Sequence, residues 1–341
     1  MKNIILGCPF DNGIRSMLRF DRGITGAATG STAVVQQFAR QYAVKYPKTK
    51  IKILPLVKYN LAVSAQNINN PTFRKKQKAA TVLAHDKITA AIEKWCQKKY
   101  IPIGVGGDHS VSYPLCRGVC RAHPYKKFGV IYFDAHFDMR PLDPDDAVGG
   151  VISSGNPFRR LIEDERLAIC GKNVVAVGIH NSKSDIYKKL EDYAFSQKVT
   201  VIFDEEVKRG QIKQIAEKAL AVAGQGTDLI YFSVDIDGID GRYAPGVSAP
   251  AENGITDKQL YDLIKIIASD HRVIAFDVAE TSARELSWLE LTENGKKQET
   301  GQEKIKKLIK TAKVAAGAID CFLNSKIQTN NRKNNFFRGV M

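Results

Sequence analysis

Short runs rich in β-branched and aromatic residues recur along the chain, and longer amphipathic stretches separate most of them. The runs are 3–6, 51–57, 101–105, 128–133, 174–177, 199–203, 229–234 and 273–276. Most are apolar without alternation, which is typical of parallel strands buried on both faces. The helix-like stretches are 32–43, 74–98, 184–196, 211–223 and 257–269. This order predicts an α/β fold, a three-layer α/β/α sandwich around a mostly parallel sheet of about eight strands.

No internal repeat, low-complexity linker or shift in composition marks a domain boundary, although 341 residues are enough for two domains. We therefore predict one domain over residues 1–327. A last long helix is expected from Gln302 to Leu323, and a loosely held, polar basic tail over residues 328–341. The charged stretch from Glu285 to Glu299 has no assignment from its pattern.

The composition excludes several classes of protein. A hydrophobic fraction of 44% and a charged fraction of 26% are ordinary for a globular chain and exclude global disorder. No apolar run is long enough for a membrane span, and the opening residues MKNIILGCPF fit a first strand better than a signal peptide. The 6 cysteines include no Cys-x-x-Cys pair, so neither a thiolate zinc site nor a disulfide framework is indicated. A cytoplasmic protein without a membrane partner is expected.

The formal net charge of +15 raises the question of a nucleic-acid partner. The lysines and arginines are spread along the expected helices and the tail, and no nucleic-acid motif accompanies them. Because charged runs usually face water, we predict no nucleic-acid partner. A basic field would still attract a dianionic substrate.

Four polar clusters follow apolar runs, at the strand ends where open parallel sheets bind their ligands. They are Gly106–Ser110, Asp134–Asp138, Asp235–Asp237 and Asp277–Glu280. In an extended segment alternate residues project to the same side, so Asp134, His136 and Asp138 face one point. Asp235 and Asp237 repeat this spacing.

Together with His109 from the first cluster, the second and third clusters supply four carboxylates and two imidazoles. The candidate metal ligands are His109, Asp134, His136, Asp138, Asp235 and Asp237. A single Asp or His at a strand end more often caps a helix or forms a turn. So many converging carboxylates would repel one another strongly without a cation, however. The donor set suits two borderline-hard divalent ions such as Mn²⁺ better than thiolate Zn²⁺ or all-oxygen Ca²⁺ sites.

The strings Gly-Gly-Asp-His-Ser, Asp-Ala-His-x-Asp and Ser-Val-Asp-Ile-Asp resemble the three signature motifs of the ureohydrolases, the arginase and agmatinase superfamily, in the family's order. Residues 9–13, 22–30 and 276–280 resemble the family's first and last loops, so the similarity covers nearly the whole chain. The resemblance implies a binuclear manganese hydrolase with two Mn²⁺ ions per subunit. It also implies a homo-oligomer, because ureohydrolases commonly assemble as trimers or hexamers.

The resemblance further implies a role for each candidate residue. His109 and Asp138 would bind one manganese, His136 and Asp237 the other, and Asp134 and Asp235 would bridge them or be shared. A metal-bridging hydroxide would attack the C–N bond of a linear amidine. Asp138 would orient that hydroxide, and Glu280 would hold the cationic amidine group.

Two loops are similar to formimidoylglutamases rather than to arginases. Asn156 is followed by Pro157 and Phe158, whereas arginases carry a histidine in the string Ser-Gly-Asn-x-His. Residues 244–250 differ from the Ala-Pro-Gly-Thr-Gly-Thr-Pro that is usual in arginases and agmatinases. A third segment, which begins at residue 177, looks like that subgroup with His180 in place of glutamine. The implied reaction is N-formimidoyl-L-glutamate plus water to L-glutamate and formamide, a step of histidine degradation.

This substrate carries two carboxylates, which a guanidinium can bind in bidentate fashion. Arg140 and Arg159 are the candidate anchors, and Ser154 and Asn156 would add hydrogen bonds; surface arginines are the alternative. His180 is a candidate general acid, because histidine titrates near neutrality. A solvated loop histidine is the alternative there.

Three departures from the family's pattern leave the metal ligands unchanged but alter the expected pocket. They are Ser31, Gly241 and the string 281–283, each of which replaces a residue or string usual in the family. An arginase, an agmatinase or another guanidino-acid hydrolase of the superfamily therefore stays open as an alternative. The alternative of another class is a catalytically silent family member that binds metal or serves a structural role, against which the complete ligand set argues.

Overall fold

The computed structural model of the chain describes residues 2–20, 23–142, 152–293 and 299–338. Eight strands form one sheet in the order β2-β1-β3-β8-β7-β4-β5-β6, and each registered pair of neighbours is parallel. The strands are β1 (Lys2–Gly7), β2 (Thr49–Ile53), β3 (Tyr100–Val105), β4 (Phe128–Phe133), β5 (Ile169–Ile179), β6 (Thr200–Phe203), β7 (Leu229–Asp235) and β8 (Val273–Ala279).

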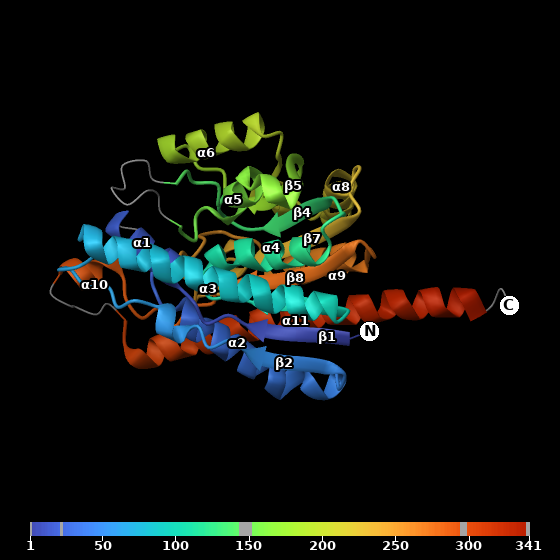
Figure 1. The fold of residues 1–341 in the computed structure, drawn as a ribbon, viewed down its shortest axis with the longest axis horizontal. Helices are drawn as coiled ribbons and strands as arrows, with labels where there is room; N and C mark the ends of the chain where they lie inside the picture. Colours follow the sequence, from blue (N-terminus) through green and yellow to red (C-terminus); the bar gives the residue numbers. More distant parts are fainter. Residues whose placement is uncertain (1, 21–22, 143–151, 294–298, 339–341) are drawn as a thin grey trace.

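Helices cover both faces of this sheet (Figure 1). The α-helices are α1 (Asn12–Met17), α2 (Ala27–Tyr42), α3 (Pro71–Gln97), α4 (Ser112–Ala122), α5 (Pro157–Glu163), α6 (Asp185–Ser196), α7 (Asp204–Lys208), α8 (Ile212–Ala223), α9 (Asp257–Ser269), α10 (Trp288–Thr292) and α11 (Gly301–Arg338). Short 3₁₀ helices are η1 (Leu18–Phe20), η2 (Ala43–Lys45), η3 (Val57–Tyr59), η4 (His109–Val111), η5 (Glu165–Leu167) and η6 (Ile236–Gly238).

Two hydrophobic cores lie on opposite faces of the sheet. One joins the sheet to α2, α8, α9 and α11, and the other joins it to α3, α4, α5 and α6. Because successive side chains of a strand point to opposite faces, Ile131 and Phe232 enter the first core while Val130 and Tyr231 enter the second. The predicted three-layer α/β/α fold with a parallel sheet is therefore confirmed.

The strand order explains where a site can form. The edge strand β2 reads TKIKI and is largely exposed, and its lysines discourage pairing with another strand. The strands β3, β8, β7 and β4 are instead consecutive in the middle of the sheet, and β4 is buried along its whole length. The four polar clusters predicted from the sequence follow these four strands, so they meet at one edge of the sheet.

The last helix differs from the expectation. It was predicted to end at Leu323, but α11 runs on to Arg338 through residues expected to form a tail (Figure 1). The chain has no proline or glycine between Gly317 and Gly339 to end the helix. The extension is also attached to α9, since Lys326 Nζ donates to the carbonyl of Asp270. The domain boundary at residue 327 stays a prediction.

The charged stretch after Glu285, which had no assignment, holds the short helix α10. Ser287 caps this helix, and Glu290 completes the capping box by accepting from the Ser287 backbone amide. Residues 294–298 lie outside the described residues. Across the described part of the chain, every helix is too short or too polar to cross a lipid bilayer.

Candidate metal centre

The first cluster reaches the site through a close contact between two loops. After β3 the chain turns through Gly107, where a Cβ atom would lie only 1.8 Å from the carbonyl oxygen of Phe10. Only glycine allows this approach, which the hydrogen bond from the Asp108 amide to the Phe10 carbonyl fixes at 3.1 Å. As a result η4 begins at His109 and its ring lies over the end of the sheet, fully buried.

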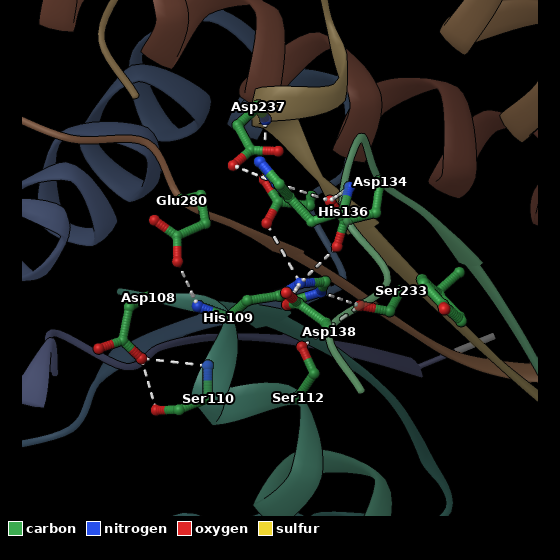
Figure 2. A network of polar contacts seen from close by, with 12 residues as sticks. Asp108, His109, Ser110, Ser112, Asp134, His136, Asp138, Ser233, Asp237 and Glu280 are labelled. Atoms are coloured by element: carbon green, nitrogen blue, oxygen red, sulfur yellow. Dashed lines mark hydrogen bonds and ion pairs between the residues drawn. The ribbon is translucent and has the colours of Figure 1, made fainter. Parts of the chain in front are cut away.

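Three carboxylates converge on one nitrogen of the His109 ring (Figure 2). Its Nδ1 lies 2.8 Å from Oδ2 of Asp138 and 3.1 Å from Oδ2 of Asp134. Oδ2 of Asp235 is also 3.1 Å away. A neutral imidazole carries at most one N–H at this position, so it cannot satisfy three carboxylate oxygens. These four donor residues could hold a cation.

A second group lies beside the first and shares one member with it. Nδ1 of His136 is 3.4 Å from Oδ1 of Asp134 and 3.3 Å from Oδ2 of Asp237. In each group the candidate ligand atoms all lie within 4.8 Å of one another. Asp134 therefore belongs to both groups, one through each oxygen. Asp235, which the family resemblance also made a shared residue, joins only the His109 group.

Electrostatics set this cluster apart from an ordinary network. Burial raises the pKa of Asp138 to about 7, and the charge of Asp134 adds to the effect. Burial, then Asp237 and Asp134, raise the pKa of Asp235 well above its usual value. Burial alone would lower the pKa of His109, but the surrounding carboxylates outweigh it and raise that pKa well above its ordinary range. The cluster is thus short of positive charge.

Two oxygens of the cluster test whether a metal fits. Oδ2 of Asp134 is buried and lies 3.1 Å from His109 Nδ1, a nitrogen that it shares with two other carboxylates, and Oδ1 of Asp237 is buried and accepts no hydrogen bond from the described residues. Buried carboxylate oxygens are nearly always paired, so acceptors short of donors in a crowd of negative charge suit the binding of a cation. Carboxylate oxygens and imidazole nitrogens are donors that divalent first-row metals accept. The residues therefore fit the predicted metal group.

Hydrogen bonds behind the cluster hold the His109 ring in place. Nε2 lies 3.0 Å from Oγ of Ser233, which donates to Oδ1 of Asp277 at 3.0 Å. Asp277 also accepts hydrogen bonds from Ser112 and Tyr231. Ser112 and Tyr231 had no role assigned from the sequence, and Ser233 entered only as the first residue of the Ser-Val-Asp-Ile-Asp string. Strand periodicity offered a clue, because Tyr231, Ser233 and the ligand candidate Asp235 occupy alternate positions of β7.

Glu280 lies on the other side of His109 (Figure 2). Its side chain is buried, and Oε1 accepts the backbone N–H of His109 at 2.7 Å. Oε2 accepts the hydroxyl of Ser248. Glu280 and Asp138 both have positive φ, at 65° and 47°. Strained backbone of this kind is often concentrated at functional sites.

A cavity of about 270 Å³ opens above these residues. Its floor is formed by four residues of the candidate ligand groups and by Glu280 beside them; the four are His136, Asp138, Asp235 and Asp237. Its walls are formed by Ile14, Met17, Gly23, Arg140, Ser154, Gly155, Tyr187, Leu190, Ser248 and Ala249. The cavity is large enough for a small substrate, and residues of the second, third and fourth polar clusters line it.

The predicted substrate-binding residues separate into two sets. Arg140 and Ser154 line the cavity. Asn156 is buried beneath this loop, where its Oδ1 accepts the Ser153 amide at 3.1 Å. Arg159 points elsewhere: its Nε lies 2.8 Å from Glu163, and its guanidinium stacks over Tyr193 at 4.0 Å.

His180, the candidate general acid, is not among the residues that line this cavity. Its backbone amide donates to the carbonyl of Ala135 at 2.9 Å, next to His136, but its side chain is 51% exposed. Its Nδ1 lies 3.2 Å from Oδ2 of Asp204, which also binds Lys208. The pair therefore fits a surface contact between β5 and α7, as in the solvated-loop alternative. Tyr187 and Ser248, by contrast, line the cavity without having been assigned a role from the sequence.

Comparison with known proteins places these observations in a family. The model of the arginase family matches residues 1–285. Formimidoylglutamase of Halalkalibacterium halodurans is 34% identical over 185 residues, which are 54% of this chain and 54% of that protein. Mitochondrial agmatinase of Gallus gallus is 33% identical over 181 residues, 52% of this chain and 49% of that protein. The chain thus spans about half the length of the curated relatives it matches.

Solved structures agree on the fold. The crystal structure of formimidoylglutamase from Bacillus subtilis superposes with a TM-score of 0.67, covering 95% of this chain and 87% of that one. The sequence identity in this comparison is 21%, so the similarity concerns the fold.

Proposed function

The chain belongs to the arginase family, and on that premise we propose that it is a binuclear manganese hydrolase that cleaves N-formimidoyl-L-glutamate to L-glutamate and formamide. The proposal includes a cytoplasmic location and a homo-oligomeric assembly, a trimer or hexamer, as in the ureohydrolases. Relatives named formimidoylglutamase, at 34% identity, support this choice, while relatives named agmatinase and guanidino acid hydrolase match at 33% and 34%, so the choice rests on the cavity.

The two groups of donors would hold the two manganese ions. Asp134 would serve both ions, and the remaining ligands would be His109, Asp138 and Asp235 for one and His136 and Asp237 for the other. When bound, two such ions lower the pKa of a water molecule and offset the negative charge that develops on the substrate.

One observation about charge carries the choice of an acidic substrate over arginine and agmatine. Apart from the metal cluster and Glu280, Arg140 is the single charged side chain on the described wall of the cavity. N-formimidoyl-L-glutamate has two carboxylates and no free ammonium group, so a cationic wall complements it. Arginine and agmatine carry an ammonium group for which this part of the wall offers no carboxylate.

The loop geometry supports Arg140 as a carboxylate anchor. Its backbone amide donates to the carbonyl of Gly155 at 2.8 Å. Its Cδ lies 2.7 Å from the point where a Cβ at Gly155 would stand, so the absence of a side chain there makes room for the arginine stem. A guanidinium set in this way can grip a carboxylate bidentately. Ser154 lies beside it and can add a hydroxyl donor.

The floor of the cavity suits a cationic amidine. Glu280 is a buried carboxylate at the cavity surface, where a cationic partner would relieve its desolvation. Asp138 also lines the cavity, and it would orient the attacking water and accept its proton. Arg140 and Glu280 would then hold the two ends of the substrate, its carboxylates and its amidine.

The test compares four substrates with purified protein loaded with manganese. They are N-formimidoyl-L-glutamate, 4-guanidinobutyrate, L-arginine and agmatine, and the measurement is kcat/KM for each. We expect the highest value for N-formimidoyl-L-glutamate. Turnover of arginine or agmatine alone would refute the assignment. No turnover of any substrate by protein with two bound ions per chain would identify the catalytically silent family member instead.

A further inference from the structure

Both oxygens of the Glu280 carboxylate already accept a hydrogen bond from the protein. Oε1 accepts the backbone N–H of His109, and Oε2 accepts the hydroxyl of Ser248. Glu280 and Ser248 are each 2% exposed, and both line the cavity. A carboxylate has about four acceptor positions, so about half of them remain for a substrate.

The position of Ser248 is fixed by its backbone. Val247 forms an antiparallel bridge with Thr281, directly after Glu280. The carbonyl of Val247 accepts a hydrogen bond from Arg284 at 2.9 Å. One residue earlier, the carbonyl of Gly246 accepts the amide of residue 282 at 2.7 Å. The segment is thus tied to the chain that follows Glu280, and the serine hydroxyl stays beside the carboxylate.

The two head groups open to this family differ in one substituent. A formimidoyl group carries a hydrogen on its central carbon, whereas a guanidino group carries a further amino group there. That amino group needs hydrogen-bond acceptors and space, and an N–H left unpaired in a buried site is costly. A site with fewer open acceptor positions therefore discriminates against the guanidino group.

We infer that Ser248 is a specificity-determining residue, which favours a formimidoyl head group over a guanidino head group by occupying Oε2 of Glu280 and the space beside it. The inference rests on the proposed function, since it concerns how the same site chooses between amidines. Arg140 selects for an acidic tail, which formimidoyl and guanidino acids share. Ser248 acts at the other end of the cavity, where the two kinds of substrate differ.

The experiment compares two substrates with the same tail, N-formimidoyl-L-glutamate and N-carbamimidoyl-L-glutamate, as the ratio of their kcat/KM values. In the manganese-loaded wild type the ratio favours the formimidoyl substrate. Ser248→Ala removes the hydroxyl, and Ser248→Gly also opens space. The freed Oε2 can then accept one charge-assisted hydrogen bond from the guanidino substrate, which corresponds to a change of about tenfold or more in the kcat/KM of that substrate. We expect the ratio to fall by about that factor in the alanine variant, and further in the glycine variant.

Two further variants serve as controls. Ser248→Thr keeps a hydroxyl and should retain the wild-type preference. Ser196→Gly changes an exposed serine at the end of α6, whose hydroxyl bonds only the carbonyl of Tyr193 among the described residues, and should leave both kcat/KM values unchanged. Bound manganese and the melting temperature are measured for every variant, so that a folding defect is recognised.

The outcomes separate the two claims. If the wild type hydrolyses neither substrate, the proposed function fails. If it hydrolyses the formimidoyl substrate but Ser248→Ala and Ser248→Gly lower both kcat/KM values equally, Ser248 only positions Glu280 and the inference is overturned while the function stands. A loss of formimidoyl preference in Ser248→Thr, despite its hydroxyl, would also overturn it.

Discussion

The Nε2 atom of His109 lies 3.0 Å from the hydroxyl of Ser233, on the ring edge opposite the atom that faces the carboxylate cluster. When Nε2 carries the proton and donates it to Ser233, Nδ1 is left as the acceptor that a metal ion requires. The hydrogen bond from Ser233 to Asp277 keeps the serine in this orientation. The serine thus controls both the tautomer and the direction of the ring.

Removing this hydroxyl should weaken one of the two metal sites. In Ser233→Ala the His109 ring loses its partner, and we expect manganese affinity at that site to fall by about ten- to hundredfold. The His136 site should keep its affinity. Calorimetric titration of metal-free protein with Mn²⁺ measures both sites, with Ser196→Ala as the control for an exposed serine. Unchanged affinity at both sites would show that Ser233 has no part in metal binding.

The sharing of Asp134 predicts unequal effects of two similar substitutions. Asp134 belongs to both groups of candidate ligands, whereas Asp237 belongs to one. Asp134→Asn should therefore release both ions, and Asp237→Asn should retain about one ion per chain, since its loss leaves the His109 group complete. Metal content after gel filtration gives the numbers. An Asp134→Asn protein that keeps two ions would contradict the assignment of a shared ligand.

Metal removal should destabilise the fold, because the buried carboxylates then repel one another. A ligand that binds only the folded state stabilises it in proportion to the logarithm of its concentration. We expect the melting temperature to fall on chelation and to rise stepwise as Mn²⁺ is added back. Asp134→Asn should show little of this rise. Equal melting temperatures with chelator and with manganese would refute a metal site at this cluster.

The residues of the carboxylate and histidine cluster could be predicted from the sequence because each follows a recognisable apolar run. Apolar runs end in Asp and His, and the carboxyl ends of parallel strands meet at one edge of the sheet. Alternation within Asp134–Asp138 then decides which side chains converge. The structure brings all six candidates together, with the strand order and the contact between Gly107 and Phe10 supplying what the local pattern does not give.

The walls of the cavity could not be predicted in the same way, because they depend on how separate segments dock. Arg140 lies in the loop after β4 and Arg159 lies in α5, and the sequence pattern does not distinguish them, but only Arg140 lines the cavity. Ser248 reaches Glu280 through a bridge between segments that the sequence does not pair. His180 follows β5, the neighbour of β4, and its backbone bonds Ala135, but its side chain turns to Asp204 on α7, which spacing along the chain does not give.

The contrast between the two arginines gives a direct test of substrate anchoring. Arg140→Gln should raise KM for N-formimidoyl-L-glutamate by about ten- to hundredfold, since a charge-assisted contact with a substrate carboxylate is lost. Arg159→Gln removes the pair with Glu163 outside the cavity and should change KM little. Steady-state kinetics of both variants compare them. Equal effects of the two substitutions would remove Arg140 as the anchor.

His85 predicts how stability depends on pH. It is buried in α3, with Nδ1 3.3 Å from Nη1 of Arg160 and Nε2 3.4 Å from Oγ of Ser110. Burial, then the charges of Arg160 and Arg117, lower its pKa well below the usual 6.5, so the ring is neutral in the folded state. Below about pH 6.5 the unfolded chain takes up a proton that the folded chain does not, so the free energy of unfolding decreases as the pH is lowered.

His85→Gln keeps an acceptor for Arg160 but removes this titration. Between about pH 6.5 and 5, its free energy of unfolding should fall less steeply than that of the wild type, by up to about 1.4 kcal/mol per pH unit. Urea unfolding at a series of pH values, with chelator present throughout, measures both slopes while metal binding is absent. The other titratable groups are the same in the two proteins, so the difference between the two slopes is assigned to His85. Parallel pH dependences would mean that the ring is already protonated in the fold, and that Arg160 makes its contact in another way.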